Sequence, residues 1–183
     1  MKKFDLFDKV QETQQREVIP VGGYKCKIMK AEEIEYSWGS VVVVSFDIAD
    51  GEYKDFFARD YKNNISDNKK WRGTIRFNQP NGKSEKADEF NARRFKTFIR
   101  AVEKSNNGYS WSWDEKTLKD KLVGFVFGEE EWEYDGRSGM AVKAQFATEY
   151  DKATGATIPA PKMIRQGNQP AQTIAQDDDD LPF

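Results

Sequence analysis

Histidine is absent from this chain of 183 residues, and cysteine occurs once, at Cys26. Without histidine there is no Ser-His-Asp or Cys-His catalytic arrangement. A single cysteine excludes an intrachain disulfide, and with no histidine beside it no Cys/His set of zinc ligands can form. The glycines also lack the spacing of a phosphate-binding loop or a dinucleotide fingerprint. We therefore expect a protein that is not an enzyme and that needs no cofactor.

The chain also lacks a large excess of either charge and any long apolar run. It has 29 basic and 31 acidic residues, and four of the acidic ones are consecutive aspartates near the C-terminus. Leaving those four aside gives 29 against 27, so the body is slightly basic and has room for a local positive groove. Over residues 4–8 acidic residues interrupt the run of apolar residues. The N-terminal sequence therefore predicts no secretory signal and no membrane partner.

Aromatic residues are abundant: the chain has 13 Phe, 7 Tyr and 5 Trp, or 14% of the sequence. This is more than a core of this size needs, and several of these residues stand beside lysine or arginine. Stacking of a base on an aromatic ring contributes about 1–3 kcal/mol whatever the base, while basic residues follow the phosphates. The composition therefore favours binding of a single-stranded nucleic acid.

Alternation of apolar and polar residues predicts three strands, over residues 24–29, 41–48 and 53–61. Residues 71–77 alternate in the same way, and the sequence leaves open whether they form a further strand. Apolar residues at steps of three and four from Ala92 to Val102 predict a helix with Asp88 as its N-cap. A capping-box spacing predicts a second, short helix from Ser112 through Lys119.

A closing hairpin is predicted after these helices. One strand starts at Leu122 and has a bulge near Gly128, a turn covers residues 135–139, and the return strand follows. Three strands, a helix and a closing hairpin are the order of the oligonucleotide-binding fold. We predict a mainly β protein with minor α structure: a five-stranded Greek-key barrel whose helix lies between the third and fourth barrel strands, followed by a disordered acidic C-terminal tail.

The sequence divides into four parts. These are an N-terminal arm (1–17), the barrel domain (18–160), a flexible linker (161–176) and an acidic tip (177–183). The apolar residues of the arm would serve either self-association into a homo-oligomer or capping of the barrel, and the sequence leaves both open.

Candidate DNA-binding residues fall in four groups. The first is a basic cluster around an indole, at the end of a polar loop: Lys69, Lys70, Trp71, Arg72 and Arg76. Its alternative is a core Trp71 among solvated charges, and the sequence favours neither. The second group, Tyr36 and Trp38, occupies the connection between the first two strands, where this fold often contacts its ligand.

The third group shares one face of the predicted third strand: Phe57, Arg59 and Tyr61. Whether that face is core or groove is left open. The fourth group lies on the closing hairpin and consists of Trp132, Arg137 and Lys143, with Tyr134 nearby. For Tyr109, Trp111 and Trp113 a core position is the better interpretation.

The chain ends in Asp177, Asp178, Asp179, Asp180, Leu181, Pro182 and Phe183. This ending resembles the C-terminal tip of bacterial and bacteriophage single-stranded DNA-binding proteins, with Leu in place of the more usual Ile. Residues 19–32 resemble the opening strand of a phage-encoded group of these proteins, and residues 122–124 with 128–134 resemble its closing hairpin.

The resemblance implies a phage or prophage protein of the bacterial cytoplasm that coats single-stranded DNA during replication, recombination and repair. It further implies that the tip recruits replication or recombination proteins. One alternative is an adaptor of a replication complex with the same fold and tip and little DNA binding of its own. Another is a metal-dependent nuclease built on Glu129 and Glu131, which is disfavoured because neighbouring carboxylates on a strand point to opposite faces.

Overall fold

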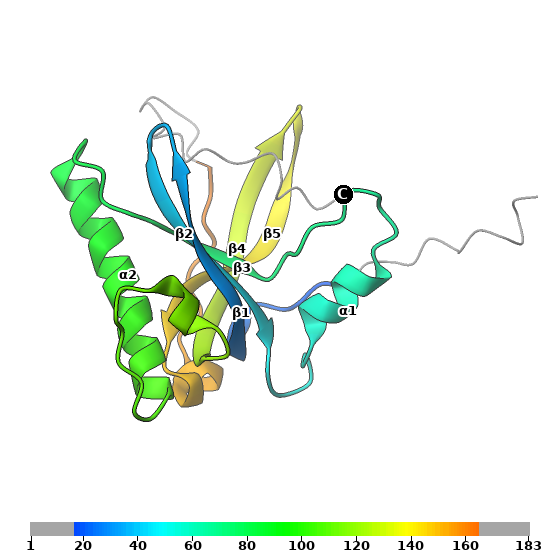
Figure 1. Cartoon of the computed structure of the whole chain (residues 1–183). Helices are drawn as coiled ribbons and strands as arrows, with labels where there is room; N and C mark the ends of the chain where they lie inside the picture. The colour runs from blue at the N-terminus through cyan, green and yellow to red at the C-terminus, as the bar shows by residue number, and fades with distance from the viewer. Residues whose placement is uncertain (1–16, 165–183) are drawn as a thin grey trace, which may run out of the picture.

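Five strands form one antiparallel sheet in the order β3-β2-β1-β4-β5 (Figure 1). The computed structural model describes residues 17–164. The strands are β1 (Gly22–Tyr36), β2 (Gly39–Ile48), β3 (Thr74–Asn78), β4 (Leu122–Tyr134) and β5 (Arg137–Thr148). The helices are α1 (Phe56–Asn63), α2 (Glu85–Ser105) and the short 3-10 helices η1 (Glu115–Leu118) and η2 (Tyr150–Gly155). The mainly β prediction is confirmed, with α2 between the third and fourth strands; none of these helices is long and apolar enough to cross a membrane.

β1 is the central strand and pairs with two partners along its length. Its first part pairs with β4, and from Cys26 onward it pairs with β2. A bulge at Met29 separates the Ile28–Phe46 pair from the Lys30–Ser45 pair. Because a bulge bends a strand and increases its twist, β1 can belong to both halves of the sheet.

The core lies on one side of the sheet, under α2. Large aromatic side chains with almost no exposed surface fill it, among them Phe46, Phe77, Phe98, Phe125 and Phe127. The rings of Phe77 and Phe98 stack with centroids 4.6 Å apart, which joins β3 to α2. The predicted helix is confirmed, but it begins earlier than expected. The hydroxyl of Ser84 accepts from the N–H of Ala87 and caps α2, whereas Asp88 accepts from backbone N–H groups of the preceding loop.

The strand predicted over residues 53–61 is wrong, because this segment forms α1. Phe56 and Phe57, at the start of this helix, are both buried. A carboxylate from β2 completes the helix start: Asp47 accepts from the N–H groups of Phe57 and Ala58 at 3.0 Å. Those groups have no partner inside a helix, so the contact with β2 favours the helical form.

The short helix predicted from Ser112 is replaced by η1, whose N-cap is Asp114. Trp113 precedes it with a φ of 63° and is 82% exposed, so the core interpretation is wrong for this residue. Tyr109 and Trp111 do pack against the core.

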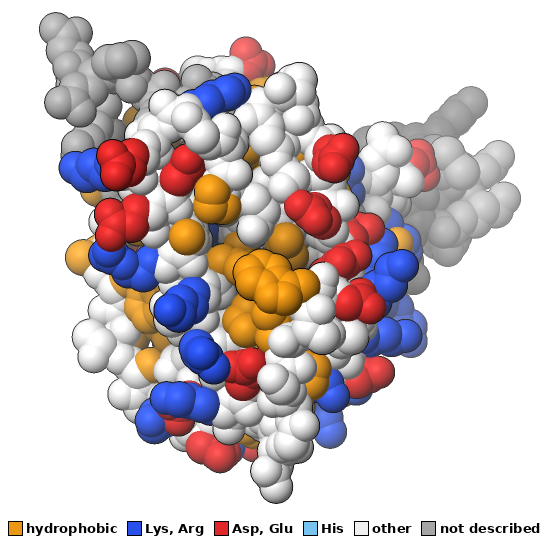
Figure 2. All heavy atoms as spheres, turned by 60° about the vertical axis from the view of Figure 1, so that its left-hand side comes forward, with side chains coloured by type: hydrophobic (Ala, Val, Ile, Leu, Met, Phe, Trp, Pro, Cys, Tyr) orange, Lys and Arg blue, Asp and Glu red, His pale blue; other side chains and the backbone are white. Residues whose placement is uncertain are grey.

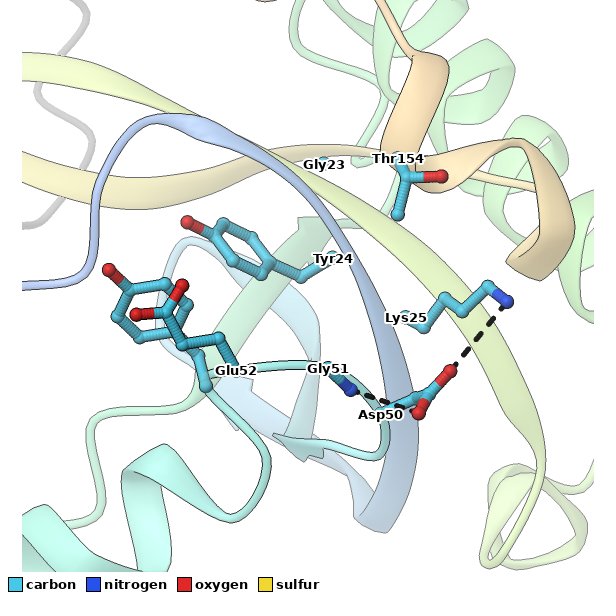
Figure 3. Close-up of a pocket in the computed structure, with 8 residues that line it drawn as sticks. Gly23, Tyr24, Lys25, Asp50, Gly51, Glu52 and Thr154 are labelled. Atoms are coloured by element: carbon cyan, nitrogen blue, oxygen red, sulfur yellow. Dashed lines mark hydrogen bonds and ion pairs between the residues drawn. The ribbon is translucent and has the colours of Figure 1, made fainter.

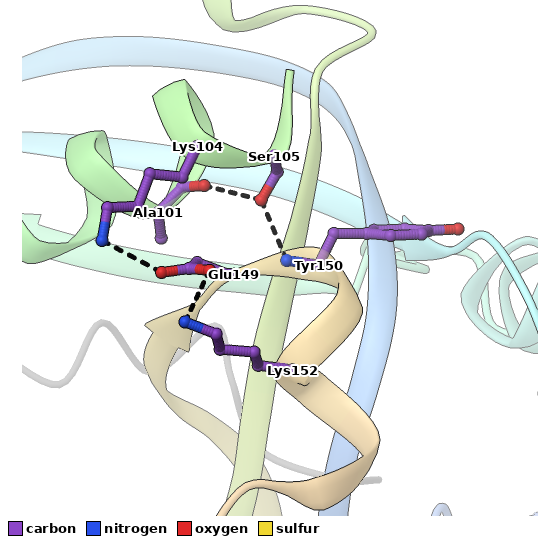
Figure 4. A network of polar contacts seen from close by, with 6 residues as sticks. All are labelled: Ala101, Lys104, Ser105, Glu149, Tyr150 and Lys152. Carbon is purple, nitrogen blue, oxygen red and sulfur yellow. Dashed lines mark hydrogen bonds and ion pairs between the residues drawn. The ribbon is translucent and has the colours of Figure 1, made fainter. Parts of the chain in front are cut away.

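The closing hairpin is confirmed, with Asp135 and Gly136 at positive φ in its turn. Its register shifts between Val126 and Phe127, close to the predicted bulge. The 3-10 helix η2, which follows β5 in the chain, is bound to the end of α2 by polar contacts (Figure 4). The hydroxyl of Ser105 donates to the carbonyl of Ala101 and accepts from the N–H of Tyr150, while Glu149 pairs with Lys104 and Lys152.

Arg94 of α2 contacts both edge strands of the sheet. Its guanidinium donates to the carbonyl of Arg76 on β3 at 2.9 Å and to that of Gln145 on β5 at 3.1 Å. The same group lies 5.1 Å from the ring centre of Phe77. Burial lowers the pKa of Arg94, and the nearby charge of Glu130 opposes that shift. One half-buried cation thus bridges β3 and β5.

Candidate nucleic-acid interface

The two faces of the β4–β5 hairpin carry different charged residues. Trp132 and Tyr134 alternate to the same side as Glu130, and cross-strand pairing places Arg137 opposite Tyr134 and Lys143 opposite Gly128 on that side. The remaining carboxylates of β4 alternate to the other side: Glu129, Glu131 and Glu133. We call the first side the hairpin face. It combines two aromatic rings with basic residues, as the sequence predicted for this element.

Trp132 lies flat across its partner strand. A Cβ placed on Gly139 would stand 3.1 Å from the indole, so glycine is what lets the ring approach the backbone. Tyr134 is 43% exposed, and Lys143 is held 3.7 Å from Glu130. A paired β ladder thus carries both rings, with Tyr134 exposed and Trp132 half-buried.

Arg76 belongs to the neighbouring edge of the sheet. It alternates away from the buried Ile75 and Phe77, and its backbone carbonyl is tied through Arg94 to β5. This contact brings Arg76, which the sequence grouped with the loop before it, toward the strand that carries Lys143.

Tyr36 and Trp38 stack on each other at the tip of the β1–β2 hairpin, with ring centres 5.2 Å apart and planes 7° from parallel. The amide of Asn81 donates to the carbonyl of Trp38 at 3.1 Å and ties this tip to the loop before α2. Glu33 and Glu35 are exposed on the same strand and alternate to the side opposite to Tyr36. The tip thus offers stacking surface, with carboxylates on the other side of its strand.

The connection from α1 to β3 supplies a third aromatic and basic group. The ammonium of Lys69 lies 4.9 Å from the ring centre of Tyr61, and that ring is 6.0 Å from Trp71. Trp71 is half-buried, and its indole N–H donates to the carbonyls of Phe46 and Gly73, so it belongs partly to the core. Residues 54–72 hold six basic and three acidic residues, which keeps this stretch positive; Lys70 is exposed there.

Three of the predicted residues have other surroundings. Phe57 is 6% exposed and stacks on Phe127 in the core, so its assignment to the DNA interface is wrong. Arg59 is exposed on α1, donates to the carbonyl of Lys54 and lies 3.9 Å from Glu17. Arg72 lies 3.7 Å from Asp60.

Lys162 is a residue that sequence reasoning missed. Residues 161 onward were assigned to a linker, yet Lys162 pairs with Glu130 in a parallel bridge and its ammonium lies 3.6 Å from that carboxylate. No pattern of charge or hydrophobicity around Lys162 predicts a partner on β4, because the contact joins segments far apart in the chain.

A cavity of about 200 Å³ lies elsewhere, between the start of β1 and the turn after β2 (Figure 3). Lys25 stands at its edge and is paired with Asp50 at 3.8 Å, while Glu52 adds a second carboxylate. The acidic lining disfavours a phosphate. On the face shown in Figure 2 a hydrophobic patch is bordered by residues of both charges.

Within residues 17–164 no three acidic or cysteine side chains gather as metal ligands. The predicted tip, 177–183, lies outside the described residues, as does nearly all of the arm. No model of a known protein family matches the chain, and no curated protein matches it either.

Proposed function

We propose that this protein binds single-stranded nucleic acid without sequence preference. The observation that carries the proposal is the hairpin face, where Trp132 and Tyr134 share one side of a paired ladder with Arg137 and Lys143, and Glu129, Glu131 and Glu133 take the other. Rings stack on bases of any sequence and cations follow the backbone. With its acidic tip, the chain is best interpreted as a phage-type single-stranded DNA-binding protein.

We also propose that the sheet belongs to a barrel of the oligonucleotide-binding type. The strand order and the meeting of β3 with β5 at Arg94 support a five-stranded Greek-key barrel of the oligonucleotide-binding type. In that fold the face of strands two and three and the connections 1–2 and 4–5 bind the ligand. Arg76, the Tyr36–Trp38 pair and the hairpin face occupy these positions.

Titration with oligo(dT) of increasing length at two salt concentrations tests the function. We expect tryptophan fluorescence to be quenched and the affinity to fall as salt rises, by a log–log slope of about −0.7 per phosphate neutralised. Double-stranded DNA of equal length serves as the control, since its bases cannot stack on the rings. Absence of both quenching and retention at low salt would overturn the proposal.

The tip is proposed to recruit replication or recombination proteins. A terminal Phe183 ring can enter an apolar pocket while its carboxylate meets a basic residue of the partner. Deleting residues 177–183 separates this proposal from the adaptor alternative. A DNA-binding protein keeps or gains DNA affinity and loses partners, whereas an adaptor loses its one activity and shows no DNA binding before or after deletion.

A further inference from the structure

Two lysines from distant parts of the chain share one carboxylate on the hairpin face. The ammonium of Lys143 on β5 lies 3.7 Å from Oε1 of Glu130, and the ammonium of Lys162 lies 3.6 Å from Oε2. Arg94 is also close enough to Glu130 for the carboxylate to raise the pKa of its guanidinium. One carboxylate therefore faces an excess of positive charge.

Backbone contacts fix the position of Lys162. Its N–H donates to the carbonyl of Glu129 at 2.9 Å, and its carbonyl accepts from the N–H of Glu131 at 2.8 Å. On either side, Pro159 packs so closely on Gly128 that a Cβ there would stand 2.6 Å from its ring, and the N–H of Ile164 donates to the Glu131 carboxylate. The chain after η2 thus contacts β4 through an isolated parallel bridge, which brings Lys162 to this face; Figure 1 shows the five strands of the sheet.

We propose that Lys143 and Lys162 together bind one phosphate of single-stranded DNA, next to a base stacked on Trp132. This inference rests on the proposed function and names a contact within it. Carboxylate and phosphate oxygens accept from ammonium groups in the same way, so Glu130 occupies the position of a phosphate between the two lysines when DNA is absent. Trp132 is two residues further along the same face, about 7 Å away along a strand, a length that one nucleotide spans.

The exchange of carboxylate for phosphate is favourable because the existing ion pairs are loose. Both exceed 3.5 Å, and the side chains of Lys143 and Lys162 are 34% and 54% exposed. Exposed pairs of this kind contribute little to stability. The lysines can therefore turn to the DNA while the backbone contacts between residues 129–131 and Lys162 stay in place.

The test uses the full chain with Lys143→Gln, Lys162→Gln, the double variant and Glu130→Gln, each titrated with fluorescently labelled oligo(dT) at several salt concentrations. Lys152→Gln is the matched control, because Lys152 is an exposed lysine paired with Glu149 on η2. Each single lysine variant should bind about threefold to tenfold more weakly and lower the salt slope by about 0.7. Because both lysines serve one phosphate, the double variant should lose little more slope than either single variant. Glu130→Gln should bind more tightly.

Lysine variants that bind with unchanged affinity and slope would overturn the inference, as would a Glu130→Gln variant that binds more weakly. Additive loss of slope in the double variant would mean two separate phosphate contacts and would also contradict it. These outcomes are distinct from failure of the proposed function, in which the wild-type chain itself does not bind oligo(dT) and both proposals fall. Circular dichroism of each variant checks that the fold is retained.

Discussion

Trp132 is the side chain on which the proposed stacking depends most directly. We predict that Trp132→Ala lowers the affinity for oligo(dT) by about 5-fold to 150-fold, the equivalent of about 1–3 kcal/mol per stacked base. Because the indole is half-buried over Gly139 and outside the core cluster, the midpoint of thermal unfolding should change less than on loss of a core side chain. Anisotropy of a labelled oligonucleotide measures the first quantity and circular dichroism the second.

Trp71→Ala is the matched comparison, since this tryptophan packs partly against the core and donates to two backbone carbonyls. It should lower the free energy of unfolding by about 2–4 kcal/mol. Equal DNA affinity of wild-type and Trp132→Ala protein would contradict the stacking role.

Tyr24 is expected to make the free energy of unfolding depend on pH in the alkaline range. Burial raises its pKa to about 12, with the charges of Tyr53 and Glu52 acting in the same direction, and its hydroxyl donates to the carbonyl of Pro20 at 2.8 Å. The neutral phenol is thus favoured in the folded state. Its contribution to stability is fully present below pH 10 and is lost as the pH rises toward 12.

We predict that Tyr24→Phe makes the unfolding free energy less dependent on pH between 10 and 12. The dependence should decrease without vanishing, because the pKa of Tyr150 is also raised, chiefly by burial. Urea unfolding at several pH values measures it. An identical pH dependence in the variant would exclude Tyr24 as the titrating group.

At the scale of elements, α1 depends on a residue of another element. Asp47 of β2 accepts from Ile48, Phe57 and Ala58. Burial raises the pKa of its carboxyl, and these three backbone N–H groups act against that shift.

We predict that Asp47→Ala destabilises the protein by about 2–4 kcal/mol, because it leaves N–H donors without partners near the core. Hydrogen exchange should show the loss of protection concentrated in α1. Asp47→Asn keeps an acceptor oxygen and should lose less. Uniform loss of protection across all strands would argue against a local anchoring role.

At the scale of the whole molecule, Arg94 joins the first and last strands of the sheet order. Replacement by Met keeps much of the volume over Phe77 and removes both donors to the carbonyls of Arg76 and Gln145. We predict a loss of about 2–4 kcal/mol in urea unfolding, with weaker DNA binding because Arg76 and Lys143 are no longer held together. Arg94→Lys, with fewer donors, should fall between wild type and Met. A Met variant as stable as wild type would show that β3 and β5 associate without this contact.

The sequence by itself determined the mainly β class, the helix between the third and fourth strands and the closing hairpin, because these depend on local periodicity and turn residues. It also grouped Trp132, Arg137 and Lys143, which lie on the two paired strands of the predicted closing hairpin. Only the tertiary structure decided that residues 56–63 are helical, since the carboxylate of Asp47 and the core supply what the alternating pattern did not show. It likewise moved Phe57 into the core and brought Lys162 to β4. Both outcomes depend on contacts between segments far apart in the chain. Local sequence patterns do not predict such contacts.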